Sequence, residues 1–235
     1  MSDFNVWRIV IASVGLIVFF IFAILKGSDA KIKFFNAKFL ARTGVFAGIS
    51  VILYIVPFLN FNVPFFPVFL NMHFDEVPAL MAGFAYGPWS AVFVILIKTI
   101  VKLPMTSTLG VGELSDLLCS LAFVIPAALI YRKHRKISSA LLGLIVGTIS
   151  QLIVSSFLVT FVILDFYIFV MGWSESQLLA LCQLANPNVT SLRWPYFWFV
   201  SMPFNAIKDI LVVILTFLLY KRMHHIIDKI GAQKN

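Results

Sequence analysis

The chain has 235 residues, of which 61% are hydrophobic and 12% charged, and its formal net charge is +8. Soluble domains carry about 25% charged residues, so this composition excludes an ordinary soluble domain and predicts an all-α integral membrane protein. The basic residues lie in short clusters beside apolar segments, which is typical of membrane topology signals and excludes a nucleic-acid-binding surface.

The first apolar run covers Ile9 to Leu25 and is followed by a basic linker at 26–42. A run of this length is at the short end for a bilayer crossing, and no small-residue cleavage site follows it, so we expect a retained transmembrane helix. The linker should be cytoplasmic. The predicted organisation is an additional N-terminal helix with its linker over residues 1–37, followed by the main membrane domain over residues 38–235.

A second span is expected from Thr43 to Leu59. Small residues recur on its first turns, which creates a surface on which another helix can pack closely. The sequence leaves open whether that helix belongs to this chain or to a partner protein. The small residues are Thr43, Gly44, Ala47 and Gly48.

The next stretch, 60–75, is aromatic and contains Pro64 and Pro67. It is too broken for a helix and too apolar for a solvated loop, so it is a candidate lid over a site. A short helix should then open at Asp75-Glu76-Val77-Pro78, where acidic residues and proline favour a helix N-terminus. It should turn at Gly87 and return as a tight hairpin over Pro88–Val101.

Three longer helices complete the predicted bundle. They are expected at Glu113–Tyr131, Ser138–Leu164 and Trp194–Tyr220, with loops at 102–112 and 165–192. The first of these loops is rich in hydroxyls and glycine. The second is the longest.

The distribution of charge predicts the orientation of the chain. Thirteen of the 18 Lys and Arg residues, but only two of the ten acids, lie in the linker 26–42, the cluster 132–136 and the tail after 220. If these segments are cytoplasmic, two crossings separate each from the next. The pattern predicts seven spans in the plasma membrane, an extracellular N-terminus and a cytoplasmic C-terminus. It places the loops 60–75, 102–112 and 165–192 together outside.

The last span carries a polar group of Asn205, Lys208 and Asp209 inside an apolar run. An ammonium in a membrane helix costs roughly 2.5–3.5 kcal/mol on insertion scales, so it indicates a binding site or a water-filled path. The predicted topology brings Lys98, Glu113 and Asp116 to the same outer half of the bundle. The alternative is that Lys208 and Asp209 only lock helices together.

Other site classes are less well supported by the sequence. Glu113 and Asp116 could serve an intramembrane hydrolase, although their spacing is more typical of ligand acceptors or ion-pair partners. A metal site would use His73 and Glu76 with these two acids. Cys119 and Cys182 lack metal-ligand spacing. A channel would show repeated pore-lining polar positions, whereas one cluster is found here.

Several motifs, in this order, resemble the substrate-binding S components of energy-coupling factor (ECF) transporters, and most closely the riboflavin-specific branch. They are Phe74-Asp75-Glu76-Val77-Pro78-Ala79-Leu80, Gly87-Pro88, Ile97-Lys98, Gly110 with Gly112, and Pro203-Phe204-Asn205 with Lys208. The likeness covers about residues 38 to 230. It implies a six-helix core, to which the first span is an addition.

The resemblance implies a transport protein that is not an enzyme. Such a subunit captures a vitamin with high affinity outside the cell and topples in the membrane on docking. Its partners would be a transmembrane T component and two ATP-binding subunits. In that family the first core helix presents small residues to the T component, which gives the small residues of the span from Thr43 a role, and the loop after it gates the site.

The resemblance also implies a set of ligand contacts. Residues matching Asn205 and Lys208 contact the flavin in riboflavin binders, so riboflavin is the expected transported ligand, with no cofactor and no metal. Asp209 would be a structural counter-charge. The other expected substrate-binding residues are Lys98, Glu113, Asp116, Thr108 and Asn71, with Phe66, Phe69 and Trp194 stacking on or packing against a flat ring.

Three positions depart from the riboflavin-specific pattern. His73 stands where an acid is usual, and Asp116 takes the place of a polar amide. The fifth core helix lacks the usual Asn, for which Thr160 or Asp165 could substitute. Extra carboxylates favour ligand donors such as ring N–H groups and hydroxyls and disfavour a phosphate. Another vitamin or precursor is the alternative substrate.

Overall fold

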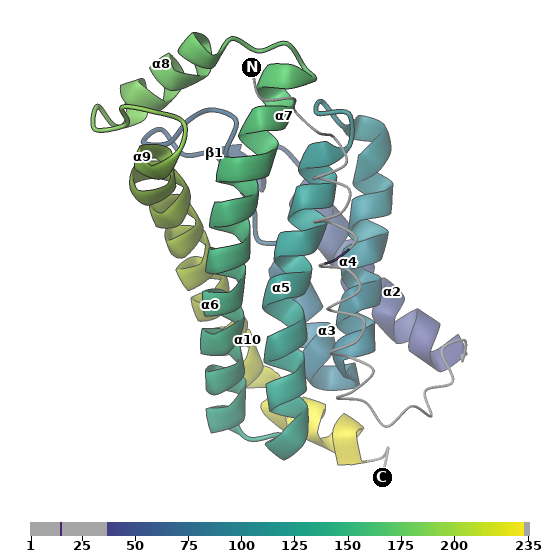
Figure 1. Ribbon diagram of the computed structural model, residues 1–235. Coiled ribbons are helices and arrows are strands. Elements are labelled where there is room, and N and C mark those ends of the chain that lie inside the picture. Colours follow the sequence, from purple (N-terminus) through teal and green to yellow (C-terminus); the bar gives the residue numbers. More distant parts are fainter. Residues whose placement is uncertain (1–14, 16–36, 233–235) are drawn as a thin grey trace.

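The computed structural model describes residue 15 and residues 37–232 as an elongated bundle of helices (Figure 1). Apart from Gly15, the expected first span Ile9–Leu25 lies outside the described residues, as does most of the linker after it. Five described helical segments are long and apolar enough to cross a membrane: Ala37–Ile55, Pro88–Met105, Val111–His134, Ile137–Phe169 and Trp194–His225.

The first described helix, α2 (Ala37–Ile55), begins and ends earlier than the predicted span. Pro57 explains its end, because the residue before a proline is disfavoured in helical conformation. The chain then forms a small antiparallel hairpin of β1 (Phe61–Asn62) and β2 (Asn71–Met72). The Asn62 side chain holds this hairpin by donating to the Asn71 side chain at 2.7 Å. The expected irregular, folded-over segment is therefore present.

The short helix α3 (Glu76–Tyr86) lies in the middle of the bundle, and nearly all of its residues are buried. With 11 residues it is shorter than the about 20 needed for a crossing. It packs against α2, α4 (Pro88–Lys102), α5 (Val111–His134) and α10 (Met202–Ala232). Gly87, with φ of 97°, makes the turn that brings α4 back beside it. The hairpin predicted from Gly87-Pro88 is thus confirmed.

The outer loops are more helical than predicted. A 3-10 turn, η1 (Leu103–Met105), extends α4, and the segment 165–192 contains all but the first residue of α7 (Leu164–Phe169) and the whole of helix α8 (Glu175–Ala185). The prediction of one long loop there was wrong. The α8 segment is helical because Leu178 and Cys182, four residues apart, share a face that is fully buried against the bundle.

Two neighbouring helices change to π-helix at the same level. In one, α6 (Ile137–Leu158) continues through η2 (Val159–Ile163) into α7. In the other, the short α9 (Trp194–Tyr196) continues through η3 (Phe197–Ser201) into α10. The two π segments contact each other. A π turn holds an extra residue and frequently marks a functional site.

Figure 1 shows that the hairpin, the loop after α4 and helix α8 gather at one end of the bundle. The α5–α6 turn and the C-terminus lie at the other end. The three loops predicted to share a side therefore do so, and the basic cluster 132–136 lies at the opposite end. A buried contact of Tyr131 with Phe84 and Tyr220 closes that opposite end.

The α5–α6 interface is a close helix contact that depends on two glycines. A Cβ at Gly143 would lie 2.7 Å from the Ala127 carbonyl oxygen, and one at Gly147 would lie 2.5 Å from that of Phe123. Both separations are shorter than real Cβ contacts. Close approach of these backbones therefore requires glycine, as in many membrane helix pairs. Because α5 and α6 both contribute side chains to the site described below, this contact also fixes how those side chains lie relative to one another.

Gly147→Ala is expected to lower the thermal stability of the detergent-solubilised protein, because overpacking costs about 1–3 kcal/mol. Gly48→Ala is the matched control, since a Cβ there meets nothing within 4 Å. Thermal unfolding followed by tryptophan fluorescence should show a lower midpoint for the first variant and an equal or higher midpoint for the second. Equal midpoints for both would contradict the packing argument.

Candidate functional site

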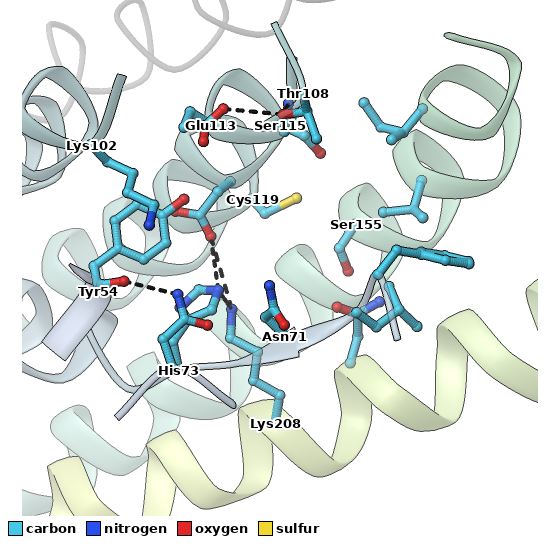
Figure 2. Close-up of a pocket in the computed structure, with 18 of the residues that line it drawn as sticks. Tyr54, Asn71, His73, Lys102, Thr108, Glu113, Ser115, Cys119, Ser155 and Lys208 are labelled. Carbon is cyan, nitrogen blue, oxygen red and sulfur yellow. Dashed lines mark hydrogen bonds and ion pairs between the residues drawn. The ribbon is translucent and has the colours of Figure 1, made fainter. Parts of the chain in front are cut away.

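A cavity of about 240 Å³ lies beneath the outer loops (Figure 2). Side chains from nearly every element of the outer half reach it, which is typical of a small-molecule site between helices. Its lining comprises Tyr54, Asn60, Phe69, Leu70, Asn71, His73, Lys102, Met105, Ser107, Thr108, Gly112, Glu113, Ser115, Asp116, Cys119, Gln151, Ser155, Val159, Ile163, Tyr167, Phe204, Asn205 and Lys208.

One wall of the cavity is backed by a buried ion-pair network centred on Lys98. This lysine has no exposed surface, and its Nζ contacts the Asp75 carboxylate, Asp116 Oδ2 at 2.8 Å and Ser120 Oγ at 3.0 Å. The network therefore joins the start of α3 to α4 and α5. Asp75 is favoured at the start of α3 because the N-terminal end of a helix dipole attracts an anion.

The second ammonium of the network, Lys208, faces the cavity. Its Nζ lies 2.8 Å from Glu76 Oε1 and 3.3 Å from His73 Nε2, whereas His73 Nδ1 contacts Asp75. His73 Nε2 also lies 3.4 Å from Asp116 Oδ1, so the imidazole joins Asp75 and Asp116 to Lys208. Figure 2 shows Lys208 extending from α10 toward His73. Two ammonium groups thus hold three carboxylates, of which Asp75 and Glu76 are fully buried.

The pair of Lys208 with Asp209 that the alternative reading required is not formed. Lys208 pairs with Glu76 across the helix interface, and both carboxylate oxygens of the fully buried Asp209 lack a hydrogen-bond partner among the described residues. The counter-charge role expected for Asp209 belongs to Glu76 on α3. Consecutive residues on a helix point about 100° apart, so Asp209 cannot follow Lys208 toward the cavity.

Glu113 has a different environment from Asp116. Its Oε2 accepts from the hydroxyls of Thr106 at 2.6 Å and Thr108 at 3.2 Å, which fixes the loop before α5. In Figure 2, Glu113 and Thr108 lie on the far side of the cavity from Lys208. Leu109 and Gly110 adopt left-handed φ values of 53° and 84° to complete this turn. Asp116 joins the ion-pair network instead.

Apolar and aromatic side chains form the wall between these polar regions. Phe69, Phe204 and Tyr167 line the cavity together with Val159 and Ile163 of the π segment. Because a π turn holds an extra residue, it rotates the residues that follow and brings these two branched side chains to one face. The resulting surface is suited to a flat, apolar ring.

The inner end of the cavity carries amide side chains. Asn205 Nδ2 donates to the Ser201 carbonyl at 2.8 Å, which leaves its Oδ1 as the available acceptor. Gln151 of α6 also lines this end, and sequence reasoning missed it. The signal was present, because Gln151 and Ser155 are four residues apart and therefore share one face of an otherwise apolar span.

Seven of the ten substrate-binding residues expected from the sequence line the cavity. They are Asn205, Lys208, Glu113, Asp116, Thr108, Asn71 and Phe69. The other three have different positions. Lys98 lies behind the wall, and Phe66 packs on Phe204 with ring centroids 5.2 Å apart. Trp194 is 54% exposed and contacts Phe161 on the outer face of the bundle.

The small residues of α2 face two directions. Thr43 and Ala47 are buried, with the Thr43 hydroxyl donating to Ser90 Oγ at 3.3 Å, so they pack within the chain. Gly44 and Gly48 are exposed, and a Cβ on either would meet nothing within 4 Å. The sequence left open whether these small residues pack within the chain or against a partner. Thr43 and Ala47 pack within the chain, whereas Gly44 and Gly48 lie on an open surface.

A metal site is not supported by the same groups. His73, Glu76 and Asp116 bring ligand atoms within 4.8 Å of one another. However, Lys208 Nζ already lies 2.8 Å from Glu76 and 4.0 Å from Asp116, so an ammonium takes the position that a metal cation would need. These acids are accounted for by ion pairing.

A membrane bundle with a partly polar cavity beneath loops at one end defines a small-molecule-binding membrane protein. Comparison with known proteins identifies the family: residues 38–220 match the model of the substrate-specific component of ECF transporters. The chain belongs to this family, which is a transport family and not an enzyme family. Its members associate with a transmembrane T component and ATPase subunits, as the resemblance implied. The hydrolase hypothesis is therefore wrong.

Individual relatives agree with this assignment. The chain is 32% identical to riboflavin transporter RibU of Staphylococcus aureus (strain TCH60) over 184 residues, covering 77% of this chain and 89% of that protein. It is 25% identical to riboflavin transporter FmnP of Bacillus subtilis (strain 168), covering 74% and 87%. A solved structure of the S component of a bacterial ECF transporter superposes with a TM-score of 0.61 at 28% identity, covering 80% and 96%.

Lys98→Met is expected to destabilise the protein by about 3–5 kcal/mol, because it leaves buried carboxylates without their ammonium. The midpoint of thermal unfolding in detergent should fall strongly. In the double variant Lys98→Met/Asp75→Asn, part of the loss should be recovered, since one of the unpaired charges is removed.

Asp209→Asn provides the control for this prediction. It neutralises another fully buried group of the same bundle but breaks no hydrogen bond to a described residue. Its unfolding midpoint should equal or exceed that of the unmodified protein, because the carboxylate it replaces has no partner. If Lys98→Met were as stable as Asp209→Asn, the network would not stabilise the bundle.

Proposed function

We propose that this chain is the riboflavin-binding S component of an ECF importer, in which separate subunits hydrolyse ATP. The observation that carries the proposal is the division of one cavity into three chemical regions. An apolar, aromatic wall suits the flavin ring, and an inner amide end suits its polar edge. The outer end, with Thr108, Ser107 and Glu113, suits the hydroxyls of a ribityl chain.

The charges of the site favour a neutral ligand of this kind. Glu113 and Asp116 supply acceptors for hydroxyl and ring N–H donors, and they oppose a phosphate. Two of the relatives are named as riboflavin transporters, which supports the same substrate. Asn205 and Lys208 are the proposed ring contacts. Lys98 does not contact the ligand in this proposal. It positions the Asp116 carboxylate, to which its Nζ donates at 2.8 Å.

We also propose an orientation. The basic cluster 132–136 and the C-terminus would lie in the cytoplasm, and the end with the hairpin would face outside. Riboflavin would then enter beneath the hairpin, whose Phe69, Leu70 and Asn71 line the cavity. The domain division at residues 37 and 38 and the retained first span belong to this proposal.

Purified protein is expected to bind riboflavin at one site and to quench its fluorescence, because the ring would pack against aromatic side chains. Asn205→Leu should weaken binding by about 10-fold or more, which is the effect of losing one buried hydrogen bond. Lys208→Met should weaken it too, and Lys208→Met/Glu76→Gln serves if the single variant unfolds. The measurement is fluorescence titration of ligand-free protein.

Trp194→Ala and Phe66→Leu are the controls, since neither side chain lines the cavity. Both should keep the riboflavin dissociation constant within about twofold. A purified protein that is colourless, fails to quench riboflavin and carries another small molecule by mass spectrometry would overturn riboflavin as the substrate. The family assignment would stand.

The open surface of α2 is the proposed contact for the T component, with Gly44 and Gly48 admitting a close helix approach. Gly48→Leu is expected to reduce recovery of the chain with a co-expressed T component and ATP-binding subunits by at least several-fold, because a large side chain would separate the helices. Affinity purification measures this directly.

Riboflavin affinity of Gly48→Leu should be unchanged, since Gly48 is remote from the cavity lining. Ile149→Trp on α6, another exposed position, tests whether any bulky surface change has the same effect. Normal assembly of Gly48→Leu would remove this face of α2 from the proposed interface.

A further inference from the structure

Gln151 is a buried amide whose oxygen receives no hydrogen bond from the described part of the chain. The side chain is 1% exposed, and its Oε1 has no partner among the described residues. An unsatisfied amide in an apolar setting is costly, because it loses its hydrogen bonds to water without replacement. Gln151 nevertheless lines the cavity, so the partner can come from whatever the cavity holds.

The surroundings of Gln151 restrict what that partner can be. Beyond Ser155, the side chains that line the cavity from the same helix are the apolar Val159 and Ile163, and Phe204 of α10 adds an aromatic ring to the lining. Ser155, one turn along α6, turns its hydroxyl toward the Leu152 carbonyl at 3.4 Å. Asn205 uses its Nδ2 on Ser201 and retains an acceptor. The polar groups that α6 and α10 offer to the ring are therefore the complete amide of Gln151, the amide oxygen of Asn205 and the ammonium of Lys208.

We propose that Gln151 determines specificity by reading the imide edge of the ligand ring, in which an N–H is flanked by carbonyls. This inference rests on the proposed function. A glutamine amide carries a donor and an acceptor side by side, so it can pair with adjacent C=O and N–H groups, as Asn and Gln pair in a bidentate manner with base edges. The Oε1 accepts from the ring N–H, and the Nε2 donates to a neighbouring carbonyl.

This pairing would place the ring inward and the ribityl chain outward. The inner end offers amides between apolar walls, whereas the outer end offers hydroxyls and Glu113. A site that hydrogen-bonds a buried N–H discriminates strongly against a ligand that lacks it, because the acceptor of the protein is then left unpaired. Gln151 therefore contributes to the choice of ligand as well as to affinity.

The test compares riboflavin with 3-methylriboflavin, in which a methyl group replaces the hydrogen of the imide nitrogen. The unmodified protein is expected to bind riboflavin at least 10-fold more tightly. Gln151→Leu should weaken riboflavin binding by about 10- to 100-fold, as expected for a lost buried hydrogen-bonding group, and change 3-methylriboflavin binding by less than about threefold. The preference between the two ligands would then largely disappear.

Ser155→Ala is the matched control, since it changes a neighbouring lining residue on the same helix whose hydroxyl faces the Leu152 carbonyl. It should retain the full preference for riboflavin. Gln151→Leu should unfold at the same or a higher temperature than the unmodified protein, because leucine of similar size replaces an amide with an unpartnered oxygen. A loss of affinity can then be separated from a loss of fold.

Two outcomes would count against the inference and are distinguishable. If the unmodified protein binds riboflavin and Gln151→Leu keeps the same preference between the two ligands, Gln151 does not read the ring edge, and the proposed function survives. If the unmodified protein binds neither flavin, the proposed function fails, and this inference fails with it.

Discussion

The structure depends on the pairing of two buried ammonium groups with three carboxylates, two of which are fully buried. Lys98 and Lys208 reach Asp75, Glu76 and Asp116 from different helices, so the network joins α3, α4, α5 and α10 at one level. Removing a charge from water is costly in a membrane interior, and the cost is offset only when each charge is paired. This requirement fixes how the helices align far more strictly than apolar packing alone would.

The same network also shapes the cavity, because its members differ in exposure to it. Lys98 and Asp75 are fully buried, whereas His73, Asp116 and Lys208 line the space. The buried Lys98 and Asp75 hold the residues that line the cavity in position. A polar site is kept preorganised for a ligand in this way. Gly143 and Gly147 of α6 set the separation of this helix from α5, so the site is built on rigid elements.

Sequence reasoning identified the parts of this arrangement whose signals are local. Lys208 and Asn205 were recognisable because polar residues are expensive in an apolar span, and the hairpin at Gly87 because its turn residues are diagnostic. Asp116 was recognisable as an ion-pair partner, and it pairs with Lys98. The main partner of Lys208 was not predictable. Glu76 and Asp209 are both plausible counter-ions for Lys208, and only the packing of α3 against α10 decides for Glu76. Helix α8 was missed because it is short, so its pattern of apolar residues is a weak helix signal. The tryptophan and proline in the flanking sequence favoured a loop.

Asp209 and Gln151 are two buried side chains with unpartnered oxygens, and they differ in one respect. Gln151 lines the cavity, and Asp209 does not. A group with no access to the cavity cannot form a hydrogen bond to a ligand, so its missing hydrogen bonds only lower the stability of the folded protein. A group at the cavity surface can regain them when the ligand binds, and the energy lost in the empty protein then becomes discrimination between ligands. The position of an unsatisfied group, rather than its presence, therefore distinguishes a recognition element from a structural weakness.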